Sequence, residues 1–168
     1  MSQIENFAHW TQALRSGSYV QGNSCLRQQV GDGEAHRFCC LGVGLNVMDP
    51  GGWADQPIDE DDGMFTHRWS DAAGHFPEYH LFEEWFGVSN DVQRTLAHLN
   101  DNESLDAMYM VQDIEGVSEE FVEKWFPTEP DEFGGITYAG DAWTFSRIAD
   151  FLEALHAELA REEVIITS

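Results

Sequence analysis

The most apolar stretch of the chain covers residues 38–47, Phe-Cys-Cys-Leu-Gly-Val-Gly-Leu-Asn-Val, and holds no charged residue. We predict that Phe38 and Cys39 end a strand and that a short buried helix over residues 41–47 follows. Gly42 and Gly44 leave little side-chain bulk, so another part of the backbone can approach closely here. The other elements are expected to pack around this central helix.

Apolar residues at helical spacing predict several further helices. The first begins with a capping box, Ser2 to Glu5, and ends before Gly17. Its buried face is expected to hold Ile4, Phe7, Trp10, Thr11 and Leu14. The other expected helices cover residues 78–86, residues 90–100 after a Ser89 cap, residues 118–125, and a long segment from Thr144. Residues 105–114 fit a helix or a strand, and residues 164–167 form a β-prone tail.

Strand patterns are short and few. Residues 26–30 and 36–40 flank Gly31-Asp32-Gly33, which indicates a β-hairpin. Shorter extended pieces are expected at residues 19–21, 64–69 and 136–138, and residues 53–77 are otherwise read as a long irregular segment. These elements predict a single α+β domain over residues 1–168, a small antiparallel sheet with several packed helices. Residues 102–143 form either part of the main core or an inserted lobe.

Charge adds more to this picture than overall composition does. The chain carries 31 Asp and Glu against 8 Lys and Arg, a formal net charge of −23. Such a balance repels nucleic-acid backbones and anionic membranes, so direct binding to either is not expected. Three interpretations remain: a surface for a basic partner, adaptation to a salty cytoplasm, or a solvated surface without a specific role. Under the first, the partner would bind Asp59, Glu60, Asp61 and Asp62.

Two further observations concern the cellular compartment. No apolar run reaches the roughly 20 residues that a membrane-spanning helix needs, and the first residues do not have the order of a signal peptide. Three cysteines, two of them adjacent, are not a disulfide framework. We therefore expect a cytoplasmic protein with reduced thiols, in a host cell if the chain is encoded by a virus.

Several motifs occur in order along the chain. Residues 10–22 read WTQALRSGSYVQG and residues 38–43 read FCCLGV; LAHLND follows at residues 96–101 and FSRIAD at residues 145–150. This series resembles small uncharacterised proteins of tailed bacteriophages and prophages, although the segment between the last two motifs is longer here. The resemblance implies a phage origin and an accessory role, and it implies no particular activity.

Polar residues that coincide with these motifs are candidates for a ligand site. They are Arg15, Tyr19, Gln21, Asn100, Asp101 and Asp150. One interpretation is a polar pocket in which Gln21, Asn100 and Asp101 bind a small, nucleotide-like ligand. The other is structural: Asn100 and Asp101 cap and turn the chain, Arg15 pairs with an acid, and Asp150 complements a helix dipole.

The remaining candidate chemistry is a thiol. Cys39 or Cys40 could act as a nucleophile at a helix N-terminus, where the helix dipole lowers a thiol pKa. Such a site also needs a histidine base, and none stands in a diagnostic context, so both residues also fit as small buried hydrophobes. The spacing of His67, His75 and His80 fits no standard zinc pattern, and we expect no metal and no cofactor.

Taken together, the sequence favours a phage accessory protein that acts by binding and counters a host system. Its partner would be a basic or nucleic-acid-binding host protein that meets the acidic surface. One alternative is sequestration of a small nucleotide-like signalling molecule. The other is a thiol-dependent hydrolase or transferase, so an enzymatic role is left open but is the less favoured one. The oligomeric state does not follow from the sequence.

Overall fold

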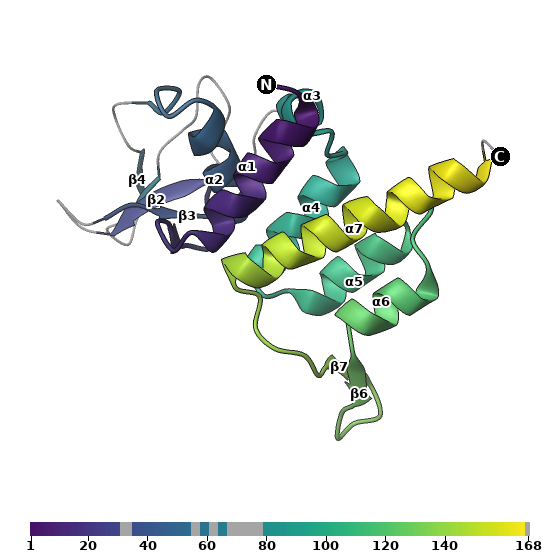
Figure 1. Ribbon diagram of the computed structural model, residues 1–168. Helices are drawn as coiled ribbons and strands as arrows, with labels where there is room; N and C mark the ends of the chain where they lie inside the picture. Colours follow the sequence, from purple (N-terminus) through teal and green to yellow (C-terminus); the bar gives the residue numbers. More distant parts are fainter. Residues whose placement is uncertain (31–34, 55–57, 61–63, 67–78, 167–168) are drawn as a thin grey trace.

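The computed structural model describes residues 1–30, 35–54, 58–60, 64–66 and 79–166, and it is an α+β protein as predicted (Figure 1). Its helices are α1 (Gln3–Arg15), α2 (Cys40–Met48), α3 (Tyr79–Phe86), α4 (Asn90–Asn100), α5 (Ser104–Gln112), α6 (Glu119–Trp125) and α7 (Phe145–Ile166). Its strands are β1 (Val20–Gln21), β2 (Arg27–Val30), β3 (Arg37–Phe38), β4 (Ile58–Glu60), β5 (Met64–Thr66), β6 (Thr128–Pro130) and β7 (Ile136–Tyr138).

The larger sheet has the strand order β1-β3-β2-β5-β4. Strands β2 and β3 pair antiparallel, with Arg27 opposite Phe38, which confirms the pairing of the predicted hairpin. Strand β1 pairs parallel with β3, so the sheet is mixed, whereas the sequence predicted an antiparallel one. Strands β6 and β7 form a separate antiparallel pair.

Helix α2 lies at the centre of the fold, as its apolar sequence predicts. All residues from Cys40 to Leu45 are buried, and α2 packs against α1 and α4. A Cβ atom added at Gly42 would lie 1.8 Å from the carbonyl oxygen of Leu26. Because Gly42 has no side chain, the backbone of Leu26, just before β2, lies directly against the helix. This confirms the expected close approach at Gly42. Gly44 instead faces side chains, those of Phe82 and Trp10.

Helix α1 begins with the predicted capping box, in which the Ser2 hydroxyl and the Glu5 carboxylate each bond the other residue's backbone N–H. Its buried face differs from the predicted one. Ile4 is 75% exposed, whereas Asn6 is buried and donates its amide to the carbonyl oxygen of Trp85 at 2.9 Å. The prediction for Ile4 was wrong because an amide with a backbone partner in α3 occupies the interior position instead.

The ambiguous segment at residues 105–114 is largely helical, and so are residues 164–166, for which a β-prone tail was predicted. Residues 104–112 form α5, which packs on α4, and α7 continues to Ile166. The predicted β-prone tail from residue 164 was therefore wrong at residues 164–166. These positions extend a helix of 22 residues, and continuing an existing helix is easier than starting a separate strand.

The segment from 102 to 143 contributes to the same hydrophobic core as the N-terminal helices. Its buried residues include Met108, Phe121, Phe126 and Trp143, and they belong to one cluster with Trp10 of α1. The β6–β7 hairpin projects from this core (Figure 1). Among the helices of the described residues, none is long and apolar enough to cross a bilayer.

Candidate functional site

Three polar residues of the sequence motifs, Gln21, Asn100 and Asp101, lie close together with the neighbouring Asn102. We call these four side chains the polar junction; it extends from the buried Asn100 to the exposed Asn102. Asn100, at the end of α4, is fully buried. Its Oδ1 accepts a hydrogen bond from the Cys40 N–H at 3.1 Å, and its Nδ2 donates to the carbonyl oxygen of Gly22 at 2.8 Å. One amide therefore ties the start of α2 to the segment after β1.

The other members of the polar junction also bond the backbone. Asp101 Oδ1 accepts from the Ser24 N–H at 2.9 Å and from Asn100 Nδ2 at 3.0 Å. Gln21 donates to the carbonyl oxygen of Trp143 at 2.9 Å and accepts from the Phe145 N–H at 3.0 Å. Asn102 Oδ1 accepts from the N–H of Trp143 at 3.1 Å. The junction thus joins β1, α2, α4 and the start of α7.

The predicted ligand residues are only partly brought together. Gln21, Asn100 and Asp101 are neighbours, but their hydrogen bonds go to the protein itself, which favours the structural interpretation. Arg15 and Asp150 lie elsewhere, where Arg15 bonds Asp150 at 2.6 Å and Glu153 at 2.6 Å. This pairing of Arg15 with an acid was the structural alternative, and the hydrogen bond to Arg15 lowers the pKa of Glu153.

Tyr19, another predicted ligand residue, borders a sizeable hollow. Its hydroxyl accepts a hydrogen bond from Asn46 Nδ2 at 3.0 Å, and Asn46 Oδ1 accepts from Trp53 Nε1 at 3.0 Å. The hollow lies between α1 and the end of α2 and measures about 570 Å³. Its lining is His9, Gln12, Ala13, Ser16, Ser18, Tyr19, Asn46, Val47 and Pro50. No carboxylate, lysine or arginine stands among these residues.

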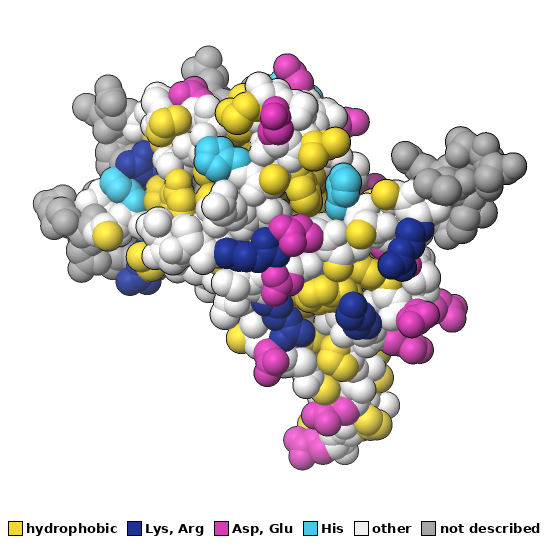
Figure 2. All heavy atoms as spheres, in the orientation of Figure 1, with side chains coloured by type: hydrophobic (Ala, Val, Ile, Leu, Met, Phe, Trp, Pro, Cys, Tyr) yellow, Lys and Arg dark blue, Asp and Glu magenta, His cyan; other side chains and the backbone are white. Residues whose placement is uncertain are grey.

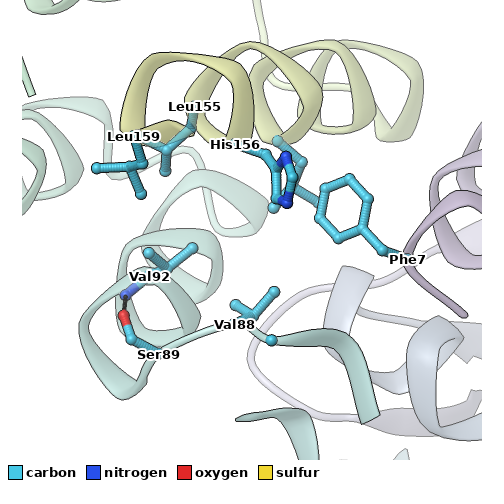
Figure 3. A pocket seen from close by; sticks show the side chains of 9 residues that line it. Phe7, Val88, Ser89, Val92, Leu155, His156 and Leu159 are labelled. Atoms are coloured by element: carbon cyan, nitrogen blue, oxygen red, sulfur yellow. Dashed lines mark hydrogen bonds between the residues drawn. The ribbon is translucent and has the colours of Figure 1, made fainter. Parts of the chain in front are cut away.

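A second hollow is apolar and much smaller. It lies between α1, the start of α4 and α7, and Figure 3 shows Phe7 and His156 facing each other across one end of it. Their ring centres are 5.1 Å apart. The volume is about 110 Å³, well below the roughly 300 Å³ at which small-molecule pockets begin. This second hollow is therefore a packing gap at the contact between α1 and α7, and we do not take it as a ligand-binding site.

The adjacent cysteines are placed where the sequence predicted, at the start of α2, but their surroundings oppose thiolate chemistry. Cys39 is the N-cap, and its Sγ accepts from the Gly42 N–H at 3.3 Å. Both thiols are buried; burial raises the pKa of Cys39 to about 12 and that of Cys40 well above its ordinary value. Near neutral pH both are protonated thiols, which are poor nucleophiles.

Acidic side chains gather in one part of the chain that sequence reasoning did not single out. We call residues 113–132 the acidic segment; it carries eight Asp and Glu and a single basic residue, Lys124. The acids are Asp113, Glu115, Glu119, Glu120, Glu123, Glu129, Asp131 and Glu132. Asp131 is half-buried and the other seven are exposed. Counting acids in windows along the chain would have found this segment.

Among the described residues, no cation forms an ion pair with a carboxylate of the acidic segment. Lys124 lies with its Nζ 5.7 Å from the ring centre of Trp125. Figure 2 shows acidic side chains at the end of the lower projection, where Figure 1 places the β6–β7 hairpin.

The structure describes the backbone of only two of the four acids at residues 59–62 that the sequence singled out. Asp59 and Glu60 belong to strand β4, while Asp61 and Asp62 lie outside the described residues, as do His67 and His75. His80, the third histidine considered with them as a zinc ligand, is described and exposed.

A different cluster brings ligand atoms of His98, Glu103 and Asp106 within 4.8 Å of one another. His98 Nδ1 already contacts Glu103 Oε2 at 2.6 Å and both carboxylates are exposed, so the cluster is explained as a surface contact.

The fold and the polar junction define an α+β protein whose motif residues hold the core together. The chain belongs to the family described as Domain of unknown function (DUF8296), whose model matches residues 2–156. No curated protein and no solved structure matches it. The match includes both the polar junction and the acidic segment.

Proposed function

We propose that this protein acts by binding and that the acidic segment engages a basic protein. The observation that carries the proposal is the set of eight carboxylates of residues 113–132, mostly exposed and without ion-pair partners among the described residues. A surface whose charges are already paired has little left for a partner. Here the seven exposed carboxylates are available to arginine and lysine side chains from outside, while Asp131 is half-buried and accepts backbone N–H groups of its own turn.

The electrostatics of such a surface favour fast and salt-sensitive association. Unpaired charges of one sign add up to a potential that attracts a complementary partner and raises the association rate. The screening length is about 8 Å at physiological ionic strength, so added salt weakens this attraction. The same potential repels nucleic acid, which supports a protein partner that itself binds nucleic acid.

The resemblance to proteins of tailed bacteriophages supports the choice of partner to test first. A phage accessory protein acts inside a bacterial host, where many defence and replication proteins present basic surfaces to nucleic acid. We therefore propose that the partner is a basic host protein and that the interaction counters its normal binding.

The test is an affinity capture from bacterial lysate at low and at high salt, with the bound proteins identified by mass spectrometry. The main variant carries Glu119→Gln, Glu120→Gln and Glu123→Gln within α6. Its matched control carries Glu83→Gln, Glu84→Gln and Asp91→Asn, which are exposed acids of α3 and α4. Both variants change the formal net charge from −23 to −20, so they differ only in where the charge is removed.

We expect one basic protein to bind the wild type at low salt and to be released at high salt. The α6 variant should retain at least about tenfold less of it than the control variant. Equal losses in the two variants would show that overall charge alone matters, and a blank with the wild type at low salt would refute the proposal.

A second function is favoured by the hollow beside Tyr19. Its lining offers hydroxyl, amide and imidazole groups but no cation for a phosphate, so an uncharged, nucleoside-like molecule suits it better than a nucleotide. Calorimetric titration with nucleosides tests this, and Tyr19→Phe should weaken binding while Tyr109→Phe, at an exposed tyrosine of α5, should not. Failure of every nucleoside to bind the wild type would exclude this second function.

A further inference from the structure

The β6–β7 hairpin presents an apolar tip to solvent. Phe133, in the loop between the strands, is 89% exposed, the highest value among the large apolar side chains of the described residues. Ile136 is 48% exposed, and Pro130 is its direct partner across the hairpin. These apolar side chains share one hairpin with exposed acidic residues, and an exposed apolar group with a polar rim is the composition typical of a contact surface.

The loop that carries Phe133 is held in one conformation. Asp131 Oδ1 accepts the N–H groups of Phe133 and Gly135, both at 2.8 Å, and the Asp131 N–H donates to the Gly135 carbonyl oxygen at 3.0 Å. Gly134 has φ +82°, a conformation that favours glycine. A Cβ added at Gly135 would lie 2.7 Å from Asp131 Oδ2. The turn is therefore preformed around one carboxylate, which lowers the entropy lost when its tip binds.

The base of the hairpin is fastened to the core. Arg147 of α7 donates to the Tyr138 hydroxyl at 2.7 Å, and its guanidinium lies 4.6 Å from the ring centre of Trp143, which is buried. The Ala139 N–H donates to the Pro127 carbonyl oxygen at 2.8 Å, closing the hairpin below its strands. The tip is thus presented on a short, fixed support.

Acidic residues surround the apolar ones at the tip. Residues 129–133 read Glu-Pro-Asp-Glu-Phe, so acidic residues lie directly beside Pro130 and Phe133 in the sequence. Glu129 and Glu132 are exposed, and no described cation pairs with them. An exposed Phe133 ring with carboxylates around it is complementary to a pocket that is apolar inside and basic at its rim. A second copy of this chain, with a net charge of −23, would repel such a tip.

We propose that the β6–β7 hairpin is the anchor of the partner interaction and that Phe133 enters an apolar pocket with a basic rim on that partner. This inference rests on the proposed function and adds to it a specific, largely salt-independent contact. The acidic segment then guides the encounter, and the phenylalanine ring determines how long the complex lasts.

The experiment compares three immobilised baits in the same lysate: the wild type, Phe133→Ala, and Ile4→Ala as a matched control. Ile4 is 75% exposed on α1, so both substitutions remove an exposed apolar side chain and leave the charge unchanged. The retained protein is identified, purified and titrated against each bait. We expect Phe133→Ala to bind at least about tenfold more weakly than the wild type, mainly through faster dissociation, while Ile4→Ala binds like the wild type.

A second variant, Gly134→Val, keeps the ring but strains the turn, and it should weaken binding as well. Equal affinity of all baits for the basic partner would overturn the hairpin proposal and leave the acidic surface standing. A blank on every bait would overturn the proposed function and this inference with it. Self-association of the wild type that Phe133→Ala abolishes would assign the tip to a second copy and would equally refute the proposal.

Discussion

Asn100 and Asp131 both fix the backbone through hydrogen bonds, but Asn100 lies in the buried core and Asp131 lies in a loop at the surface. Asn100 lies fully buried in the polar junction and bonds the Cys40 N–H and the Gly22 carbonyl oxygen. Asp131 lies at the base of the hairpin loop and accepts two backbone N–H groups of its own turn. In the junction these bonds connect segments far apart in the chain. In the hairpin they fix a local loop so that other side chains face outward.

The difference separates side chains that hold the fold together from side chains that the proposed function assigns to binding. The motif residues that looked like a ligand site have their polar atoms engaged by the protein, so they stabilise the fold. The acidic segment carries no motif of that kind; apart from Asp131, whose carboxylate holds the turn, its acids are exposed, and none of them forms an ion pair with a described residue. Substitutions in the two regions should therefore have opposite effects on stability and binding.

The largest effect is expected from Asn100→Ala. It leaves a buried N–H and a buried carbonyl group without partners, each worth about 2 kcal/mol, so we expect a loss of about 4 kcal/mol in the free energy of unfolding. Urea denaturation measures this value. Asn90→Ala, at an exposed asparagine in the first turn of α4, is the control and should change it by less than about 0.5 kcal/mol. A small effect at Asn100 would mean that the junction is not a stabilising network.

The glycines of α2 give the next largest effect. Gly42→Ala places a methyl group against the backbone of Leu26, which cannot move as a side chain can, so we expect a loss of about 3 kcal/mol. At Gly44 the nearest atoms belong to the rings of Phe82 and Trp10, at 3.0 and 3.2 Å. Gly44→Ala should therefore cost clearly less, and equal losses in the two variants would contradict this account of the close approach.

The buried thiols predict a loss of stability at alkaline pH. The pKa of Cys39 is about 12 in the folded protein and near 9 when the chain is unfolded. Below pH 9 both states keep the proton and stability is unaffected; above it the unfolded state loses the proton first, so stability falls. From pH 9 to 10.5 this thiol should reduce the free energy of unfolding by about 2 kcal/mol.

The comparison of wild type and Cys39→Ala isolates that contribution. Urea midpoints at pH 8 and 10.5 should fall less in the variant than in the wild type. If both fall alike, the pKa of Cys39 is the same in the folded and unfolded states, and this account of burial is refuted. If the wild type falls less than the variant, the folded state favours the thiolate, and the thiol-dependent enzyme that the sequence left open would become the better interpretation.

The smallest effect on stability is expected at the hairpin tip. Phe133→Ala removes a ring that is 89% exposed and should change the free energy of unfolding by less than about 0.5 kcal/mol. Phe126, seven residues earlier, is 2% exposed, and Phe126→Ala should cost about 4 kcal/mol. Thermal or urea unfolding of both variants would show whether the tip of the hairpin contributes as little to stability as the exposure of Phe133 implies.

The sequence predicted those elements whose signals are local. The Ser2–Glu5 capping box, the stop at Gly17 and the apolar run of α2 all depend on neighbours in the chain. It did not predict that Asn6, and not Ile4, is buried on α1, because the hydrogen-bond partner of Asn6 is the carbonyl oxygen of Trp85, 79 residues away. Strand β6 was missed as well, since Thr-Glu-Pro has no alternation of apolar and polar residues.

The candidate site was harder to predict than the fold. Residue type alone shows that Gln21 and Asn100 are polar, but it does not show whether a ligand or the backbone satisfies them. The acidic segment was visible in the composition, but a shorter and denser run at residues 59–62 drew the prediction instead. Exposure and pairing distinguish the two kinds of polar residue, and both come from the tertiary structure.

The hydrogen bonds of Gln21 have a consequence for the order in which the molecule assembles during synthesis. Its partners, Trp143 and Phe145, follow it by 122 and 124 residues. A nascent chain cannot make these bonds until the ribosome has released the start of α7. We expect the earlier helices to emerge with part of their apolar surface uncovered, so chaperones that bind such surfaces should accompany the chain until its last helix arrives.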